Sequence, residues 1–207
     1  MKFLTEYQYF APITCFKNWF HSSHIIFEQY EYYQKMSFRN RCLIAGANGI
    51  IHLSVPLELG RNQKKLMRDV RIAADESWQK QHWRSIVSSY NRSPWFDHYR
   101  DDLVVLYETP VQFLCDWDLR CFEWIVKKLR LNIGVAATGI YRDIYDPLEY
   151  VDQRNSIQPK NYHTIPAPLY RQVFDDRLGF LPNLSILDLL FCAGKEASLL
   201  LANQPEP

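Results

Sequence analysis

The chain has 207 residues, of which 47% are hydrophobic, and a formal net charge of +1. This length and composition fit one globular domain, which we assign to residues 1–202, followed by a flexible tail at 203–207. The nearly neutral charge argues against a nucleic-acid-binding protein, which needs a basic surface. Since no apolar run could span a bilayer and the first residues do not resemble a signal peptide, we expect a cytoplasmic protein without an integral membrane segment.

The first 30 residues predict a parallel βαβ unit. Residues 2–5 form the expected first strand, residues 13–21 carry the apolar stripe of a helix, and residues 25–30 alternate as a second strand. The short connection makes the two strands parallel. The loop at residues 8–12 would then lie at the carboxyl edge of the sheet, where open α/β sheets bind ligands.

A β-hairpin is expected next, because Asn48-Gly49 favours a two-residue type I′ turn. This turn would pair Cys42 with Val55 and place both on the core face of the hairpin. Arg41 and His52 would share the opposite face. That face is either a solvated outer surface or one wall of a polar cleft.

Residues 76–91 predict a helix whose apolar side includes Trp78, His82 and Tyr90 at intervals of four residues. His82 therefore belongs to the side of the helix that faces the protein. Two roles remain open for it: a hydrogen-bonded structural residue, or an acid, base or phosphate donor in a pocket.

The middle of the chain predicts a short helix at residues 97–107 and a strand at 133–139. Between them, Thr109-Pro110-Val111-Gln112 has the pattern of a helix start, with Thr as cap and Pro at the first position. The long helix that follows would expose Asp116 and Asp118 on a solvated face.

Residues 141–171 are polar and contain several prolines, and a loop of this length usually forms a lid or the rim of a pocket. A strand is expected at residues 170–174. Ser185-Ile186-Leu187-Asp188 then has the pattern of a capping box, which gives Asp188 a structural role. A last helix is expected to end near Ala202.

No motif of metal or cofactor chemistry is evident. The chain has no glycine-rich phosphate loop, zinc-hydrolase motif or nucleophile elbow, and its histidines lack metal spacing. The cysteines are odd in number and include no Cys-x-x-Cys pair, so we expect them to be reduced and mostly buried. We therefore predict no metal and no cofactor; the cysteines are Cys15, Cys42, Cys115, Cys121 and Cys192.

Six short motifs are spread over nearly the whole chain. They are Tyr9-Phe10-x-Pro12, Arg39-Asn40-Arg41, Leu53-Ser54-Val55-Pro56, Trp78-x-x-x-His82, Tyr90-x-x-x-Pro94-Trp95-Phe96 and residues 184–191. Together these motifs resemble the WbqC-like family of bacterial proteins, which is associated with the biosynthesis of surface polysaccharide, notably O-antigen. The chain departs from the family pattern in being shorter between residues 141 and 171. It also has Gln81 where Lys is common and Cys192 where Asn is common.

Together, the elements predict an α/β fold in which a mixed sheet with a βαβ start is joined by an appended β-hairpin and a helical layer. An α+β fold is the alternative. We expect a pocket between the loop at residues 9–10, residues 39–41 and the helix at 78–90. His82 is the candidate catalytic acid or base. The candidate substrate-binding residues are Tyr9, Phe10, Arg39, Asn40, Arg41, Trp78, Tyr90 and Trp95.

The resemblance implies a transferase-like enzyme that modifies a nucleotide- or lipid-linked sugar, with acyl or aminoacyl transfer as the expected chemistry. Its partner would be a small-molecule or sugar-linked substrate. Arginine suits bidentate recognition of phosphate or carboxylate, and aromatic rings suit stacking on a sugar. The alternative is a non-catalytic binding or assembly protein of envelope biogenesis. The sequence carries no signal for an oligomeric state.

Overall fold

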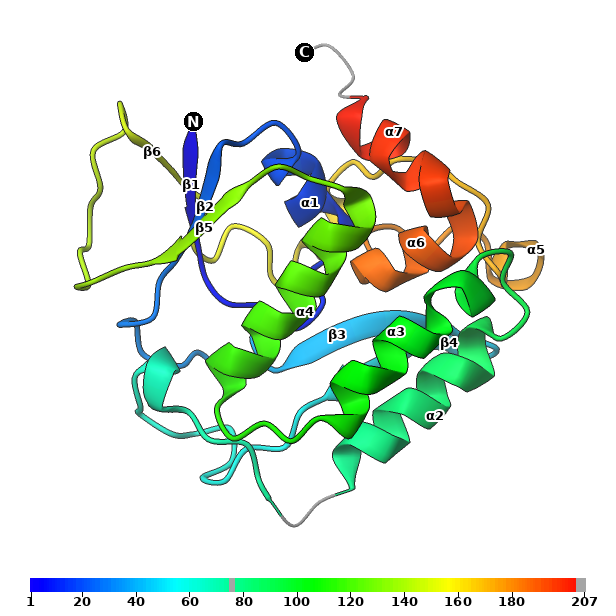
Figure 1. The fold of residues 1–207 in the computed structure, drawn as a ribbon, viewed down its shortest axis with the longest axis horizontal. Coiled ribbons are helices and arrows are strands. Elements are labelled where there is room, and N and C mark those ends of the chain that lie inside the picture. The colour runs from blue at the N-terminus through cyan, green and yellow to red at the C-terminus, as the bar shows by residue number, and fades with distance from the viewer. Residues whose placement is uncertain (75–76, 204–207) are drawn as a thin grey trace.

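A parallel four-stranded sheet and a separate hairpin form the β structure of the protein. The computed structural model describes residues 1–74 and 77–203, so residues 75–76, where the sequence predicts the start of a helix, and the predicted tail at 204–207 lie outside the described residues. In the sheet, the strand order is β5-β2-β1-β6, and every neighbouring pair is parallel (Figure 1). The strands are β1 (Lys2–Thr5), β2 (His24–Phe27), β5 (Gly134–Ala137) and β6 (Tyr150–Asp152).

The predicted βαβ start is confirmed. Helix α1 (Ile13–Trp19) connects β1 to β2, and these strands pair in parallel with Phe3 opposite Ile25. The expected α/β class, with its separate hairpin and helices, is confirmed as well.

Strand β6 lies inside the segment that the sequence predicts to be one long loop. Its Tyr150 pairs with Lys2 of β1, so β6 is an edge strand of the sheet, and the sequence pattern does not predict it. A strand of three residues is too short to show a periodicity. The strand expected at residues 170–174 is wrong. Those residues are irregular and lead into the short helix α5 (Asp175–Leu178), because the backbone N–H of Gln172 donates to the Asp175 carboxylate instead of to a strand.

The hairpin consists of β3 (Arg41–Gly46) and β4 (Gly49–Ser54), and its predicted register is wrong by two residues. Cys42 lies opposite Leu53 rather than opposite Val55. Gly49 begins the second strand with a φ of 127°, a conformation that glycine adopts readily, so the turn is Ala47-Asn48. Since side chains alternate with a period of two, a shift of two leaves the faces unchanged, and Arg41 and His52 do share one face.

The helical layer follows the expected order. The helix predicted to begin at residue 109 instead begins at Leu114, because Phe113 is extended and pairs with Arg71 in an antiparallel bridge. The Thr109 hydroxyl donates to the Val105 carbonyl, so Thr109 ends the preceding helix. The other α-helices are α2 (Trp78–Tyr90), α3 (Phe96–Glu108), α4 (Leu114–Leu129), α6 (Ile186–Ala193) and α7 (Ala197–Ala202).

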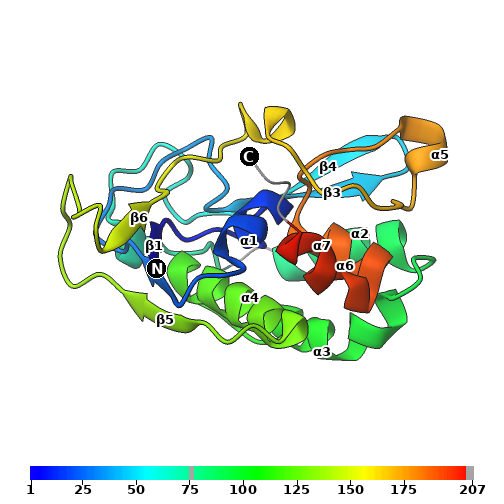
Figure 2. The same ribbon diagram turned by 90° about the horizontal axis from the view of Figure 1, so that it is seen from above.

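Aromatic side chains join the sheet to the helices. Phe122 of α4 packs against Phe16 and Trp19 of α1 and against Phe27 of β2, with ring centroids 5.0–5.9 Å apart. The sheet occupies one end of the molecule, and the hairpin with α2 occupies the other (Figure 2).

In the part of the chain that the structure describes, no helix has the length and apolar character needed to cross a membrane.

Asp118 of α4 is buried, which contradicts the expectation of a solvated face. Only 1% of its surface is exposed, and neither carboxylate oxygen has a hydrogen-bond partner among the described residues. Its position between Leu114 and Cys121 places it on the apolar stripe of the helix. Burial raises the pKa of Asp118 well above its usual range, and the charge of Arg39 opposes this shift.

Asp188 connects three parts of the fold. Ser185 caps α6 as expected, since its side chain accepts from the backbone N–H of Leu187. The Asp188 side chain does not close a capping box; it accepts hydrogen bonds from Tyr90, Tyr170 and Gln172 instead. The Tyr90 hydroxyl donates to Asp188 Oδ1 over 2.6 Å and accepts from the backbone N–H of Ala45 over 3.0 Å. This hydroxyl therefore joins α2 to α6 and β3.

We predict that Tyr90→Phe lowers the free energy of unfolding by about 1–3 kcal/mol, because the buried Ala45 N–H loses its acceptor and Asp188 loses a donor. Urea unfolding measures the change. Tyr150→Phe is the matched control, since the Tyr150 hydroxyl makes no hydrogen bond among the described residues, and it should change stability by less than about 0.5 kcal/mol. Equal effects of the two variants would contradict the role given to Tyr90.

Candidate functional site

The carboxyl edge of the parallel sheet gathers the polar residues that follow each strand. Glu6 follows β1, Glu28 follows β2, Thr138 follows β5 and Arg154 follows β6. Glu28 Oε1 accepts a hydrogen bond from Thr138 Oγ1 over 2.7 Å, and Glu28 Oε2 lies 3.7 Å from Arg154 Nη1. Parallel strands end at one edge, so residues far apart in the chain meet there, as in other open α/β sheets.

A buried arginine organises this edge. Arg39 is fully buried and donates to Glu31 Oε1 from Nε over 3.1 Å and from Nη2 over 2.6 Å. Its Nη2 also donates to Asn155 Oδ1 over 2.9 Å. The backbone N–H of Asn155 donates to Glu6 Oε2 over 2.9 Å. The network therefore joins the segments that follow β1, β2 and β6 to the start of the hairpin.

Glu31 has an unusual electrostatic environment. Burial raises its pKa to about 7, the charge of Arg39 opposes this shift, and the nearby Glu6 and Glu28 carboxylates add to it. Protonated and ionised forms are thus both present at neutral pH. Both Arg39 hydrogen bonds go to Oε1, whereas Oε2 accepts none from the described residues and is not sealed from solvent.

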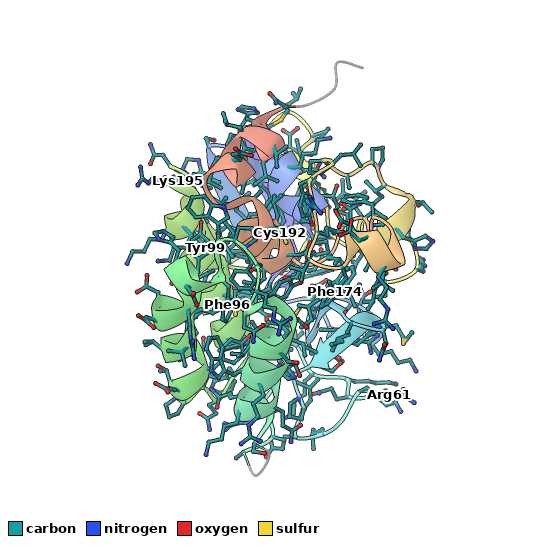
Figure 3. All side chains as sticks on the ribbon, turned by 90° about the vertical axis from the view of Figure 1, so that its right-hand side faces the viewer. Arg61, Phe96, Tyr99, Phe174, Cys192 and Lys195 are labelled. Atoms are coloured by element: carbon teal, nitrogen blue, oxygen red, sulfur yellow. The ribbon has the colours of Figure 1, made fainter. Side chains whose placement is uncertain are left out.

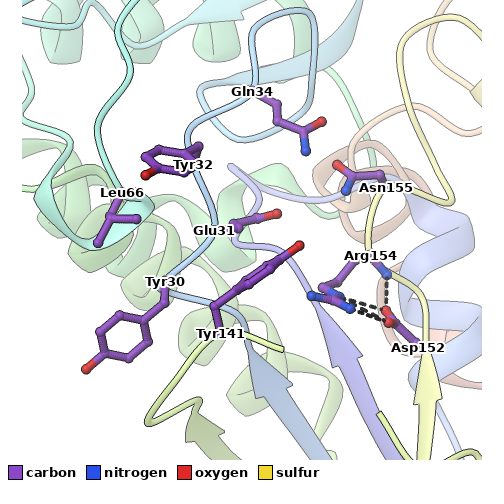
Figure 4. A pocket seen from close by; sticks show the side chains of 9 residues that line it. All are labelled: Tyr30, Glu31, Tyr32, Gln34, Leu66, Tyr141, Asp152, Arg154 and Asn155. Carbon is purple, nitrogen blue, oxygen red and sulfur yellow. Dashed lines mark hydrogen bonds and ion pairs between the residues drawn. The ribbon is translucent and has the colours of Figure 1, made fainter. Parts of the chain in front are cut away.

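A pocket of about 780 Å³ opens beside Glu31 (Figure 4). Tyrosine rings and one leucine supply its apolar surface, and carboxylate, amide and guanidinium groups supply its polar surface. Four of its residues come from the 141–171 segment, which therefore contributes to the rim of the pocket. The lining residues are Tyr30, Glu31, Tyr32, Gln34, Leu66, Tyr141, Asp152, Arg154 and Asn155.

Arg154 is held in one orientation at the pocket. Its Nε and Nη2 donate to the Asp152 carboxylate, and its Nη1 and Nη2 also donate to the carbonyl oxygens of Arg142 and Asp143. The guanidinium carbon lies 5.5 Å from the centroid of the Tyr141 ring. Because its donors are already engaged, Arg154 orients Asp152 and Tyr141 rather than offering a free charge.

His82 lies in the interior, within a cluster of aromatic residues. Its Nδ1 is 3.0 Å from the Tyr9 hydroxyl, which is 2.7 Å from the Tyr107 hydroxyl. The ring of Trp78 meets the His82 ring edge-on, with centroids 5.2 Å apart. Burial lowers the pKa of His82 to about 4, so the imidazole is neutral at pH 7. Tyr9, Trp78 and His82 are thus brought together as expected, but in the core.

Other residues expected to bind substrate make contacts within the protein. Phe10 packs edge-on against Trp117 and Trp124. Asn40 accepts from the Tyr33 hydroxyl and donates to the Val55 carbonyl, which closes the open end of the hairpin.

Two further candidates are also engaged elsewhere. Tyr90 belongs to the Asp188 network. Trp95 lies so close to Gly194 that a Cβ there would approach Trp95 Cδ2 to 2.1 Å.

Arg41 and His82 lie on opposite sides of the hairpin. Arg41 and Cys42 are consecutive in β3, so their side chains point to opposite faces. The Cys42 thiol faces the Tyr9 hydroxyl, which is bonded to His82. Arg41 therefore points away from His82 and lines a different depression. Of the arginines expected in the site, Arg39 reaches the carboxyl edge and Arg41 does not.

Sequence reasoning missed Glu31 and the tyrosines beside it, although a signal was present. Residues 28–34 follow β2 directly and contain two glutamates and three tyrosines, at an edge already expected to bind ligands. Asp152 and Asn155 could not be placed in the same way, because β6 was not recognised. Among the described residues, no three His, Cys, Asp or Glu side chains gather as a metal site.

Comparison with known proteins identifies the family. The profile of the WbqC-like protein family matches residues 8–141, and the chain belongs to this family. Over 201 residues it is 27% identical to the uncharacterized protein Rv1507c of Mycobacterium tuberculosis, with 84% of each chain covered. No solved structure matches the chain. The matched range includes Glu31 and Arg39 but ends before β6, which supplies the opposite rim of the pocket.

The burial of His82 predicts a pH dependence of stability. Unfolded histidine has a pKa of about 6.5. Since the pKa of His82 in the folded protein is about 4, the unfolded chain binds a proton between these values that the native state does not. The contribution of His82 to the free energy of unfolding is fully present above pH 6.5 and declines as the pH falls. We expect the wild type to lose about 2 kcal/mol more than His82→Asn between pH 7 and pH 5.

Urea unfolding at the two pH values measures this difference. His163→Asn is the control, because His163 is exposed and should leave the wild-type slope unchanged. If His82→Asn kept the wild-type slope, His82 would not be a buried neutral histidine.

Proposed function

We propose that this chain is a cytoplasmic, transferase-like enzyme that modifies a nucleotide- or lipid-linked sugar in the biosynthesis of bacterial surface polysaccharide such as O-antigen. Acyl or aminoacyl transfer is the proposed chemistry. The observation that carries the proposal is the pocket at the carboxyl edge, which combines tyrosine rings with Glu31. The association of WbqC-like proteins with O-antigen biosynthesis supports the pathway.

The composition of the pocket supports a sugar as ligand. A sugar presents apolar C–H faces and many hydroxyl groups, so a site for it needs flat apolar surfaces and planar polar groups. The rings of Tyr30, Tyr32 and Tyr141 supply the first, and Gln34 and Asn155 belong to the second. A volume of about 780 Å³ lies within the usual range for small-molecule sites.

Glu31 is our candidate acid or base, in place of His82. Transfer of an acyl group to a sugar hydroxyl or amine requires the attacking group to lose a proton, and the leaving group of the donor to gain one. A carboxyl group with a pKa of about 7 can accept and then return that proton near neutral pH. Glu31 Oε2 is available for this, while Arg39 holds Oε1. The burial of His82, Tyr9 and Trp78 favours a structural role for them.

A non-catalytic binding or assembly protein remains the second candidate, and it would use the same pocket. The two candidates differ in whether the sugar is changed chemically. Mass spectrometry of a nucleotide sugar incubated with the protein and an acyl donor, such as an acyl-CoA, distinguishes them. A bound but unmodified sugar supports the binding protein.

We expect Glu31→Gln to lower turnover by about 10²–10⁴-fold, because it removes the proton acceptor but keeps an oxygen for Arg39.

Tyr32→Ala, which removes an exposed ring, should weaken sugar binding about tenfold and leave the fold intact. Binding is measured by calorimetry and turnover by mass spectrometry. Leu199→Ala, at an exposed position of α7, is the control and should alter neither.

Turnover by Glu31→Gln at the wild-type rate would refute the role of Glu31. If Tyr32→Ala and Leu199→Ala bound sugar equally well, the ligand would occupy a different site. Circular dichroism of Glu31→Gln is needed beside these measurements, because the variant leaves the buried Arg39 charge without its partner.

A further inference from the structure

We propose that a second depression, at the open end of the hairpin, binds the phosphate or diphosphate group of a ligand. It has a volume of about 310 Å³ and lies where β3 begins and β4 ends. Arg41 and Arg61 supply its charge, and Ser54 and Asn40 belong to its polar surface. Among the residues that the structure describes, no carboxylate lines it. This proposal concerns a site separate from the sugar pocket and does not rest on the proposed function.

The unpaired side chain of Arg41 is the main evidence for a ligand in this depression. Its side chain is half-buried and makes no hydrogen bond or ion pair with the described residues, and its Nε is sealed from solvent without a partner. Partial burial of an unpaired guanidinium is costly. Arg39 and Arg154 each form an ion pair with a carboxylate, although Arg39 Nη1 is also buried without a partner among the described residues. Arg41 has no such ion pair with the described residues. An anion that binds in the depression would provide Arg41 with the missing partner.

The base of the depression is rigid. The Asn40 side chain accepts a hydrogen bond from Tyr33, which precedes β3, and donates one to the carbonyl of Val55, which follows β4. These bonds hold the backbone next to Arg41 in place. Arg61 comes from the loop after β4, next to Gly60 with a φ of 64°, and its side chain is exposed. Figure 3 shows Arg61 at the periphery of the molecule, beyond the hairpin. The site therefore combines one fixed and one exposed arginine.

A phosphate or diphosphate fits this pair better than a single carboxylate does. Each guanidinium presents parallel N–H donors that match the oxygens of phosphate, and two arginines match more than one negative charge. The depression also adjoins the sugar pocket. Tyr32 and Gln34 line the pocket, whereas Tyr33 and Met36 line the depression, so the segment at residues 32–36 contributes to both sites.

Calorimetric titration with inorganic pyrophosphate at low salt tests the site. We expect Arg41→Gln to weaken binding at least tenfold and Arg41→Lys to weaken it less, since lysine keeps the charge but loses the fork. Arg61→Gln should weaken it several-fold. The matched control is Arg84→Gln, at an exposed position of α2, which should bind pyrophosphate like the wild type.

Two further ligands identify the source of the phosphate. Tighter binding of a nucleoside diphosphate than of a short prenyl diphosphate would assign the site to a nucleotide-linked ligand, and the reverse would assign it to a lipid-linked one. The proposal is overturned if the wild type does not bind pyrophosphate, or if Arg84→Gln weakens binding as much as Arg41→Gln. It is also overturned if acetate at equal concentration displaces pyrophosphate.

Discussion

The buried ion pair between Arg39 and Glu31 is the interaction on which the site depends. Three glutamates, Glu6, Glu28 and Glu31, meet at the carboxyl edge with almost no exposure to water. Carboxylates so placed repel one another unless cations lie among them. Arg154 lies 3.7 Å from Glu28, and Arg39 pairs with Glu31 from the start of the hairpin, an element outside the parallel sheet. Loss of one partner of such a pair typically costs about 3–5 kcal/mol.

The same ion pair also leaves a titratable carboxyl group at the site. Arg39 takes only one oxygen of Glu31, and burial keeps the remaining carboxyl group near its midpoint at neutral pH. Around it, Tyr32 and Tyr141 come from segments more than 100 residues apart in the numbering and form the pocket wall (Figure 4). The fold thus brings a titratable group and a binding surface to one sheet edge, which is where such folds hold ligands.

Local signals in the sequence were sufficient for elements that local chemistry determines. The βαβ start, the faces of the hairpin and the helix at 78–90 all follow from periodicity, and the structure agrees with them. The pattern at Thr109 predicts a helix start, but a threonine hydroxyl can serve either end of a helix, and the tertiary pairing of Phe113 with Arg71 decides between them. Asp118 is predicted on a solvated face because charged residues are rarely buried, but in the structure it lies on the apolar stripe of α4.

Long-range contacts could not be inferred in the same way. Strand β6 has three residues, and its pairing with β1 spans most of the chain. Without β6, the sequence offers no reason to place Asn155 beside Arg39. His82 was expected in a pocket from its type and its helical face, but the same face is buried by Tyr9 and Trp78. Helical spacing identifies which residues face the protein, and it does not distinguish a pocket wall from the core.

The central claim is that burial, opposed by Arg39, holds the Glu31 carboxyl group near its midpoint at neutral pH. An NMR titration that follows the side-chain carboxyl carbon of Glu31 tests this directly. The expected midpoint is about pH 7, and it should rise further in Arg39→Met, because the opposing charge is removed. A wild-type midpoint near 4.3, the value of an unperturbed glutamate, would contradict the account.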